Sequence, residues 1–160
     1  MLSNVGLRLQ SLLGSPLLLA CVSSWLCAQF IKTLIKLFSG KVHSFQELFE
    51  LLFWRTGSMP SSHSSITACL CTTIGYRAGV DSDIFILSAV FYLVTIRDAV
   101  GVRRANGRQA RRLNEIGEIL KEKGLFEDFK KLKEVNGHSP MEAFVGSLLG
   151  FFIGIAFCVL

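Results

Sequence analysis

The sequence has 160 residues, 51% of them hydrophobic, and its mean hydropathy is +0.48. This length fits one domain, and this composition is too apolar for a soluble domain of that size, so it indicates an integral membrane protein. The net charge of +5 is unevenly distributed, because 11 of the 17 Lys and Arg residues lie between Arg97 and Lys133. A basic segment beside hydrophobic ones is more typical of a cytoplasmic membrane face than of a nucleic-acid-binding surface, and we expect no nucleic acid partner.

The first long apolar segment covers residues 16–38 and is long enough to cross a membrane. Its charged residues, Lys32 and Lys36, lie near its end. Gln29 and Lys32 are three residues apart and therefore share one face of a helix. Lys32 is either an interfacial anchor, whose ammonium group reaches the headgroups, or a cation that faces inward. Spacing alone favours the anchor.

Residues 40–54 have a different pattern, in which Phe45, Leu48, Phe49 and Leu52 recur at helical spacing among polar residues. This segment is too short to span a bilayer, and the pattern predicts an amphipathic helix on the membrane surface.

A polar turn with the sequence GSMPSSHSS follows at residues 57–65 and leads directly into an apolar helix. Its proline presets the backbone, its serines can cap the helix start, and the first N–H groups of that helix point forward, which together make an anion site. His63 adds a group that exchanges a proton near neutral pH. The alternative is a capped helix that carries a surface histidine.

Two short apolar segments follow, at residues 64–78 and 84–96. Both fall short of the roughly 20 residues that a straight span needs, so we expect them to be tilted, extended at their ends or sheltered by other helices. Residues 97–137 form a polar, basic loop, in which amphipathic spacing predicts a surface helix or a helical hairpin.

The last segment, residues 141–160, is almost wholly apolar and predicts a spanning helix. Gly146, Gly150 and Gly154 recur at every fourth position and give this helix a face of small residues. Such a face serves either packing within the chain or a homodimer.

Four alternating spans place the loops 39–61 and 97–137 on the same side of the membrane. Of the 17 Lys and Arg residues, 15 lie on this side, and the positive-inside rule assigns it to the cytoplasm. The sequence therefore predicts an all-α fold: one membrane-embedded domain over residues 1–160, with a bundle of about four spans, interfacial amphipathic helices and a basic cytoplasmic loop at 97–137.

A second histidine motif, GHSPMEAFVG, stands at the start of the last span. Glu142 follows His138 by four residues, close enough on a helix to accept a hydrogen bond from the imidazole and orient its other nitrogen toward a substrate. The same residues also read as a capping box, with Ser139 at the N-cap and Glu142 at N3. Spacing leaves both alternatives open.

Three motifs, GSMPSSHSS, RDAVGVRRANGRQARRLN and GHSPMEAFVG, occur in this order. The chain thereby resembles the divergent branch of the type-2 phosphatidic acid phosphatase superfamily, whose wider relatives include acid phosphatases and vanadium haloperoxidases. The resemblance covers residues 28–150. It implies that His138 is a nucleophile that forms a phosphohistidine, that Glu142 orients its ring and that His63 protonates the leaving oxygen.

The same resemblance implies a phosphate-binding set and a mechanism that requires no metal or other cofactor. Lys32 stands near the position of a lysine that binds phosphate, and Ser61 and Ser62 stand where backbone N–H groups bind phosphate oxygens. The charge of the transferring phosphoryl group is then offset by fixed cations and N–H groups.

The sequence departs from the family pattern at three positions. Leu132 stands where the wider superfamily has an arginine, Ser58 replaces a glycine and Arg97 replaces an aromatic residue. If a guanidinium clamps the phosphate, the best candidates are Arg103 and Arg104, because only arginine presents a planar fork, and Asp98 is placed to orient one of them. For Arg108, Arg111 and Arg112 a basic face that binds anionic lipid is favoured.

These observations predict a membrane phosphatase or phosphotransferase that acts on a lipid phosphate or diphosphate at the cytoplasmic face of the plasma membrane. Its expected partners are this substrate, membrane lipids and, through the glycine face, a second copy. The alternative is a non-catalytic protein that binds anionic lipid or scaffolds a partner. A channel is disfavoured because the middle spans lack charged residues to line a path.

Overall fold

The computed structural model describes residues 2–39, 59–126, 128–134 and 137–160. Within these residues every regular element is helical, which confirms the predicted all-α class. The predicted amphipathic helix at residues 40–54 lies outside the described residues. The elements are α1 (Leu2–Leu13), α2 (Pro16–Phe38), α4 (Ser62–Ala78), α5 (Asp83–Arg97), the π-helix η1 (Asp98–Val102), α6 (Arg103–Glu122) and α7 (Pro140–Val159).

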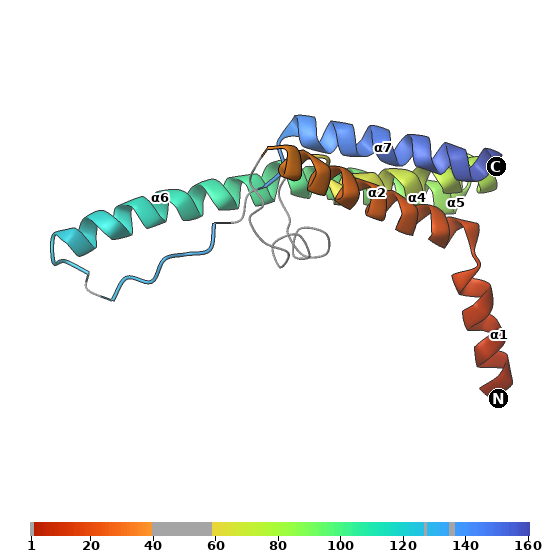
Figure 1. Ribbon diagram of the computed structural model, residues 1–160, viewed down its shortest axis with the longest axis horizontal. Coiled ribbons are helices and arrows are strands. Elements are labelled where there is room, and N and C mark those ends of the chain that lie inside the picture. Colours follow the sequence, from red (N-terminus) through yellow and green to blue (C-terminus); the bar gives the residue numbers. More distant parts are fainter. Residues whose placement is uncertain (1, 40–58, 127, 135–136) are drawn as a thin grey trace.

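Four of the described helices, α2, α4, α5 and α7, lie side by side as a bundle (Figure 1). Helix α4 is central: it packs most extensively against α7 and also contacts α2 and α5. The chain direction alternates, so the ends of α2 and α5 meet the beginnings of α4 and α7 at one end of the bundle. We call this the motif end, because it carries both histidine motifs. Helix α1 extends away from the opposite end.

In the described part of the chain, three helical stretches are long and apolar enough to cross a membrane: residues 16–38, 83–122 and 140–159. The second combines α5, η1 and α6, so the short segment predicted at 84–96 is extended at its end. Helix α4, with 17 residues, is not among the three. Its many buried residues show that the neighbouring helices shelter it, which is one of the three arrangements predicted for a short span.

The glycine face of α7 packs against α4. A side chain at Gly146 or Gly150 would collide with the backbone of Ser61 or Ser65, and one at Gly154 would press on the carbonyl of Cys69. The backbones of α4 and α7 therefore approach closely, as small residues permit in membrane helices. Of the two predicted uses of this face, packing within the chain is what the structure shows. A homodimer through this face stays a prediction.

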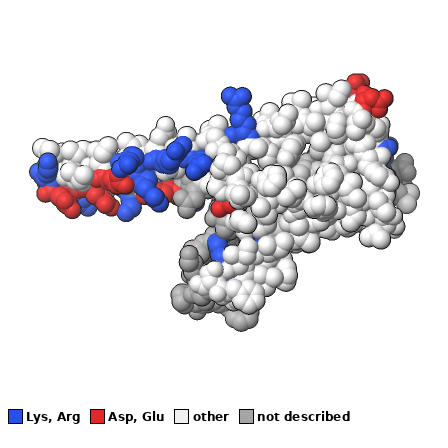
Figure 2. Space-filling model, turned by 90° about the horizontal axis from the view of Figure 1, so that it is seen from above, with Lys and Arg blue, Asp and Glu red and all other residues white. Residues whose placement is uncertain are grey.

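The outer surface of the bundle is apolar. The face of the bundle seen in Figure 2 is almost free of charged residues, whereas Lys and Arg gather on the arm formed by α6, together with Asp and Glu. Large apolar side chains such as Phe30, Leu93 and Phe152 are exposed on the bundle. An exposed apolar surface of this extent suits contact with lipid rather than water.

Helix α6 projects beyond the motif end as this arm (Figure 1). Of the two alternatives predicted for the 97–137 loop, the described residues of this loop show the surface helix and no second helix of a hairpin. The chain turns at Gly124, whose φ is +69°, and residues 128–134 return without helical structure. Asn114 explains this, because its side chain donates to the carbonyl of Leu132 (3.0 Å) and accepts from the N–H of Leu132 (2.8 Å).

Candidate active site

His138 and Glu142 form a hydrogen-bonded pair at the beginning of α7. The distance from His138 Nδ1 to Glu142 Oε2 is 3.2 Å, and His138 is only 4% exposed. The same carboxylate oxygen accepts the N–H of Ser139 at 3.0 Å, and Ser139 Oγ accepts the N–H of Glu142 at 3.2 Å. Glu142 therefore takes part in the capping box and contacts the His138 ring at the same time, so both alternatives are present. With a proton on Nδ1, the lone pair of His138 lies on Nε2.

The backbone around His138 is attached to the junction of η1 and α6. The N–H of His138 donates to the carbonyl of Ala99 at 3.1 Å. Gly137 lies directly against the backbone of Arg103 and Arg104, where a Cβ atom would collide. These two contacts fix the position of the His138 backbone relative to η1. The sequence analysis identified neither Ala99 nor Gly137 as a residue that positions the site. The glycine immediately before His138 was a signal that could have indicated a close backbone contact.

His63 lies in the first turn of α4 and faces the same region as His138. The centroids of the two imidazole rings are 6.4 Å apart, and the rings are tilted by 56°. His63 Nδ1 is buried and has no hydrogen-bond partner among the described residues. Two histidines that are distant in the sequence thus lie next to each other at the motif end.

Lys32 is buried, with 2% of its surface exposed. Its ammonium group donates to Gln29 Oε1 and to Ser62 Oγ, both at 3.1 Å. The interfacial anchor favoured by spacing is therefore wrong, and Lys32 is an inward-facing cation held between α2 and α4. Within the described residues no carboxylate forms an ion pair with it. A buried ammonium whose hydrogen-bond acceptors are both neutral has a third N–H and a positive charge to offer an anion.

Ser61 and Ser62 are both buried at the start of α4. Ser61 Oγ accepts from the N–H of Ser64 at 3.3 Å, and the N–H of Ser61 donates to the carbonyl of Glu142 at 3.0 Å. Ser61 thus caps α4 and joins it to α7, and its backbone N–H is not directed at an anion. The N–H groups of Ser62 and His63 lie in the first helical turn, where intrahelical acceptors are absent.

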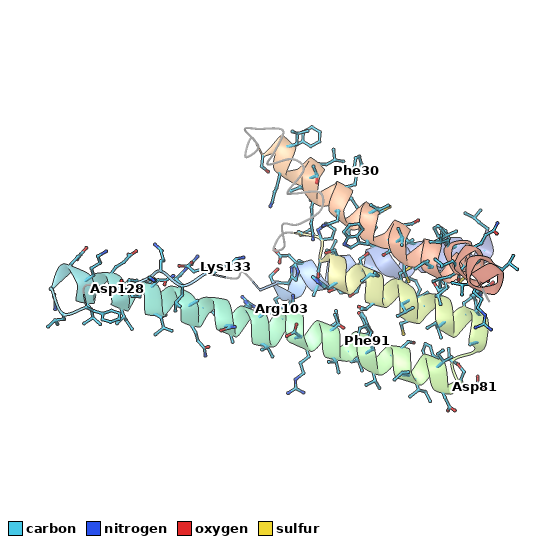
Figure 3. The ribbon with its side chains drawn as sticks, turned by 90° about the horizontal axis from the view of Figure 1, so that it is seen from below. Phe30, Asp81, Phe91, Arg103, Asp128 and Lys133 are labelled. Carbon is cyan, nitrogen blue, oxygen red and sulfur yellow. The ribbon has the colours of Figure 1, made fainter. Side chains whose placement is uncertain are left out.

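Arg103 is the arginine that the structure brings to the histidines. Its Nε donates to Asp98 Oδ2 at 2.6 Å, and both side chains are partly exposed. Figure 3 shows Arg103 at the point where the arm leaves the bundle. Arg104 makes no side-chain hydrogen bond or ion pair in the described part of the chain. Leu132, which stands where the wider superfamily has an arginine, lies in the segment that returns along the arm. Its backbone is hydrogen-bonded to the side chain of Asn114.

The surroundings of His138 lower its pKa. Burial of the imidazole is the main cause, and the positive charges of Lys32 and Arg103 act in the same direction. The hydrogen bond to Glu142 and the negative charge of that carboxylate raise the pKa in part. The net effect favours the neutral imidazole, which is the form that can act as a nucleophile.

The structure is therefore that of a helical membrane protein with a histidine–carboxylate pair, a second histidine and a buried lysine at one end of its bundle. The sequence model of the Divergent PAP2 family matches residues 13–153, and the chain belongs to that family. It is 36% identical over 146 residues to the uncharacterized membrane protein YuiD of Bacillus subtilis (strain 168), a match that covers 85% of this chain and 89% of that protein. No solved structure matches the chain significantly.

Proposed function

We propose that this protein transfers or hydrolyses the phosphoryl group of a lipid phosphate or diphosphate through a phosphohistidine on His138. The observation that carries the proposal is the buried Lys32, which has only neutral partners and lies beside the two histidines. An ammonium desolvated in this way is stabilised by an anion that enters the site. Membership of a family related to phosphatidic acid phosphatases makes phosphate the fitting anion.

The first step is attack by Nε2 of His138 on phosphorus. Glu142 holds the Nδ1 proton, so the electron pair on Nε2 is free to form the N–P bond. The negative charge of the bound phosphate favours the protonated form of His63, which gives its proton to the leaving oxygen as the P–O bond to the lipid breaks. Lys32, Arg103 and the first-turn N–H groups of α4 offset the charge on the phosphoryl oxygens.

The second step releases the phosphoryl group. Neutral His63 accepts a proton from a water molecule, whose oxygen attacks phosphorus, and the N–P bond breaks to return its electron pair to His138. Free phosphate leaves, and both histidines return to their starting protonation states. If an acceptor hydroxyl takes the place of water, the same step is a phosphoryl transfer.

The position of these groups supports a lipid substrate. The motif end closes a bundle whose outer surface is apolar, so a phosphate headgroup reaches His138 while its hydrocarbon chain stays in the bilayer. By the positive-inside rule, the basic residues on the arm support a cytoplasmic location for this end. The plasma membrane is the proposed location.

The experiment is phosphate release by the purified chain in detergent without added divalent metal. The substrate panel contains phosphatidate, phosphatidylglycerol phosphate and a polyprenyl diphosphate, and His138→Ala is the inactive control. Release that disappears in His138→Ala supports the proposal. Folded protein that releases no phosphate from any of the three, and transfers none to an added acceptor alcohol such as glycerol, contradicts it.

A second candidate, binding of anionic lipid without turnover, is favoured by the gathering of Lys and Arg on the arm (Figure 2). The two functions differ in their sensitivity to substitution. A binding protein keeps its affinity for phosphatidate vesicles in His138→Ala and His63→Ala and loses affinity in Arg103→Ala. An enzyme loses turnover in both histidine variants while it still binds lipid.

A further inference from the structure

A groove of about 480 Å³ separates α5 from α7 near the motif end. Arg97, Gly101 and Pro140 border its entrance, and Tyr92 and Ser147 lie deeper. A second hollow, of about 300 Å³, shares Tyr92, Phe144 and Ser147 with the first. The shared residues show that the two hollows adjoin each other, and we call them together the groove, which reaches from Pro140 to Phe151 along α7.

The two hydroxyl groups that Tyr92 and Ser147 contribute to the wall of this groove are hydrogen-bonded within the protein. The hydroxyl of Tyr92 donates to Ser147 Oγ at 2.8 Å, and Ser147 Oγ donates to the carbonyl of Ala143 at 2.8 Å. These hydroxyls are therefore engaged with each other and with the backbone. A molecule in the groove would therefore contact mainly the apolar side chains of Ile96, Val100, Phe144 and Phe151.

The groove opens toward the bilayer. Ser88 is the single buried residue of α5, which is described along its whole length, so this helix lies at the edge of the bundle. Phe144 and Phe151 on the facing wall are also exposed. Both helices belong to stretches that can cross the membrane, which makes hydrocarbon the surrounding medium.

The length of the groove matches one leaflet. Its wall on α7 runs from Pro140 to Phe151, which at a rise of ~1.5 Å per residue is about 16 Å. The hydrocarbon core of a bilayer is ~30 Å thick, so one leaflet contributes about half of that. A single chain from the leaflet at the motif end fits this length.

The entrance of the groove and the candidate active site share the same backbone. Ala99 accepts the N–H of His138, and the residues that follow it, Val100 and Gly101, line the groove. Pro140 is two residues after His138 and borders the entrance. Arg97 adds a positive charge there, which complements an anionic headgroup.

We propose that this groove holds one hydrocarbon chain of the lipid phosphate substrate, with Arg97 beside the headgroup. The proposal rests on the proposed function, since it names the part of the substrate that the active site does not contact. It makes chain length, and not only the phosphate, a determinant of specificity.

The test is to block the entrance without disturbing the fold. Gly101 lines the entrance and a Cβ atom there would meet nothing within 4 Å, so Gly101→Leu adds an apolar side chain at the entrance without a collision at its Cβ. Gly6 in α1 is equally open and far from the groove, and Gly6→Leu is the matched control. Values of kcat/KM are measured for a phosphatidate with two long chains and for a soluble short-chain phosphate.

We expect Gly101→Leu to lower kcat/KM for the long-chain substrate by about tenfold or more, because filling an apolar subsite removes the binding that the chain supplies. Turnover of the soluble phosphate and both activities of Gly6→Leu stay at the wild-type level. An equal loss on both substrates, or no loss on either, overturns the proposal.

A second measurement separates this proposal from the proposed function, because it does not depend on turnover. Full-length His138→Ala protein is photolabelled with a phosphatidate that carries a diazirine in one acyl chain, and the labelled peptides are sequenced. Label on the lining residues Tyr92, Phe144 or Phe151 that is lost in the Gly101→Leu background supports the groove, even if wild-type protein releases no phosphate. Label that avoids these residues overturns the groove, even if phosphate is released.

Discussion

At the scale of single residues, Lys32 shows the sharpest conflict between burial and charge. Desolvation of an ammonium costs several kcal/mol, and its partners Gln29 and Ser62 are neutral. We therefore expect Lys32 to destabilise the folded protein when no anion is bound and to stabilise it once an anion is bound.

This conflict predicts that inorganic phosphate raises the thermal unfolding temperature of the wild-type protein and leaves that of Lys32→Met unchanged. Without phosphate, Lys32→Met is at least as stable as wild type, because a buried cation has been replaced by an apolar side chain of similar length. The matched control is Arg112→Met, which removes an exposed cation from the arm and keeps the response. A phosphate response that survives in Lys32→Met would show that Lys32 is not the anion ligand.

His138 sets the expected pH dependence. The reactive form is the neutral imidazole, so activity is present above its pKa and is lost as the pH falls through it. Because burial, Lys32 and Arg103 lower this pKa, the acidic limb of kcat/KM lies below about pH 6.5, the usual value for histidine. Glu142→Gln removes an interaction that raises the pKa, so it moves the limb to still lower pH.

Glu142→Gln also lowers kcat by about 10²-fold or more, since the orientation of the ring is lost. The measurement is a pH–rate profile of both proteins with a soluble phosphate. An acidic limb above pH 6.5, or one that does not move in Glu142→Gln, is incompatible with His138 as the nucleophile.

Sequence spacing predicted some of these residues better than others. The proximity of His138 and Glu142 follows from four residues on one helix and could be predicted. Lys32 was placed at the interface because its acceptor on Ser62 belongs to another helix, and spacing within one helix cannot show such a contact. The carbonyl of Ala99 could not be predicted at all, because any residue type supplies a backbone acceptor.

At the scale of elements, the contact between α4 and α7 determines where the histidines lie. Gly146, Gly150 and Gly154 let the two backbones touch along most of their length, and the first of these contacts lies beside Ser61, at the start of the candidate site. The glycine spacing was evident from the sequence. The sequence did not show that α4 is the helix that covers these glycines, because a stripe of small residues does not identify its partner.

Gly150→Ala is predicted to destabilise the protein by about 1–3 kcal/mol, since its Cβ would collide with backbone atoms of Ser65 and Cys69 that cannot move aside. Thermal unfolding in detergent measures the loss, and Gly6→Ala, at an open position of α1, is the neutral control. Equal unfolding temperatures for the two variants would contradict the close approach of α4 and α7.

The junction of α5, η1 and α6 is the second element that positions the site. Gly137→Ala places a Cβ against the backbone of Arg103 and Arg104, which displaces His138 from its contact with Ala99. We expect kcat to fall by on the order of 10²-fold with little change in KM, because the imidazole moves while the phosphate ligands stay. A loss confined to KM would assign Gly137 to substrate binding instead.

At the scale of the whole molecule, alternating helices bring both histidine motifs to one end, as the count of spans predicted. Figure 3 shows Asp81, between α4 and α5, at the end of the bundle opposite to Arg103, and Asp128 far out on the arm. The groove between α5 and α7 was beyond sequence reasoning, since its walls come from helices whose relative placement depends on α4.

The arrangement predicts a definite labelling pattern in inside-out and right-side-out vesicles. In a background without cysteines, Asp128→Cys reacts with an impermeant maleimide only from the cytoplasmic side, and Asp81→Cys only from the other side. The count of basic residues at the motif end is the physical reason. Labelling in the reverse sense would place the candidate site outside the cytoplasm.

The most direct test of the account is to trap the phosphoryl group on the protein. Purified full-length chain is mixed with phosphatidate labelled with ³²P in its phosphate, quenched at alkaline pH, where a phosphohistidine persists, and digested. The account predicts label on the peptide that contains His138 and none in His138→Ala. Release of phosphate by wild-type protein that never carries label, or label that remains in His138→Ala, would contradict it.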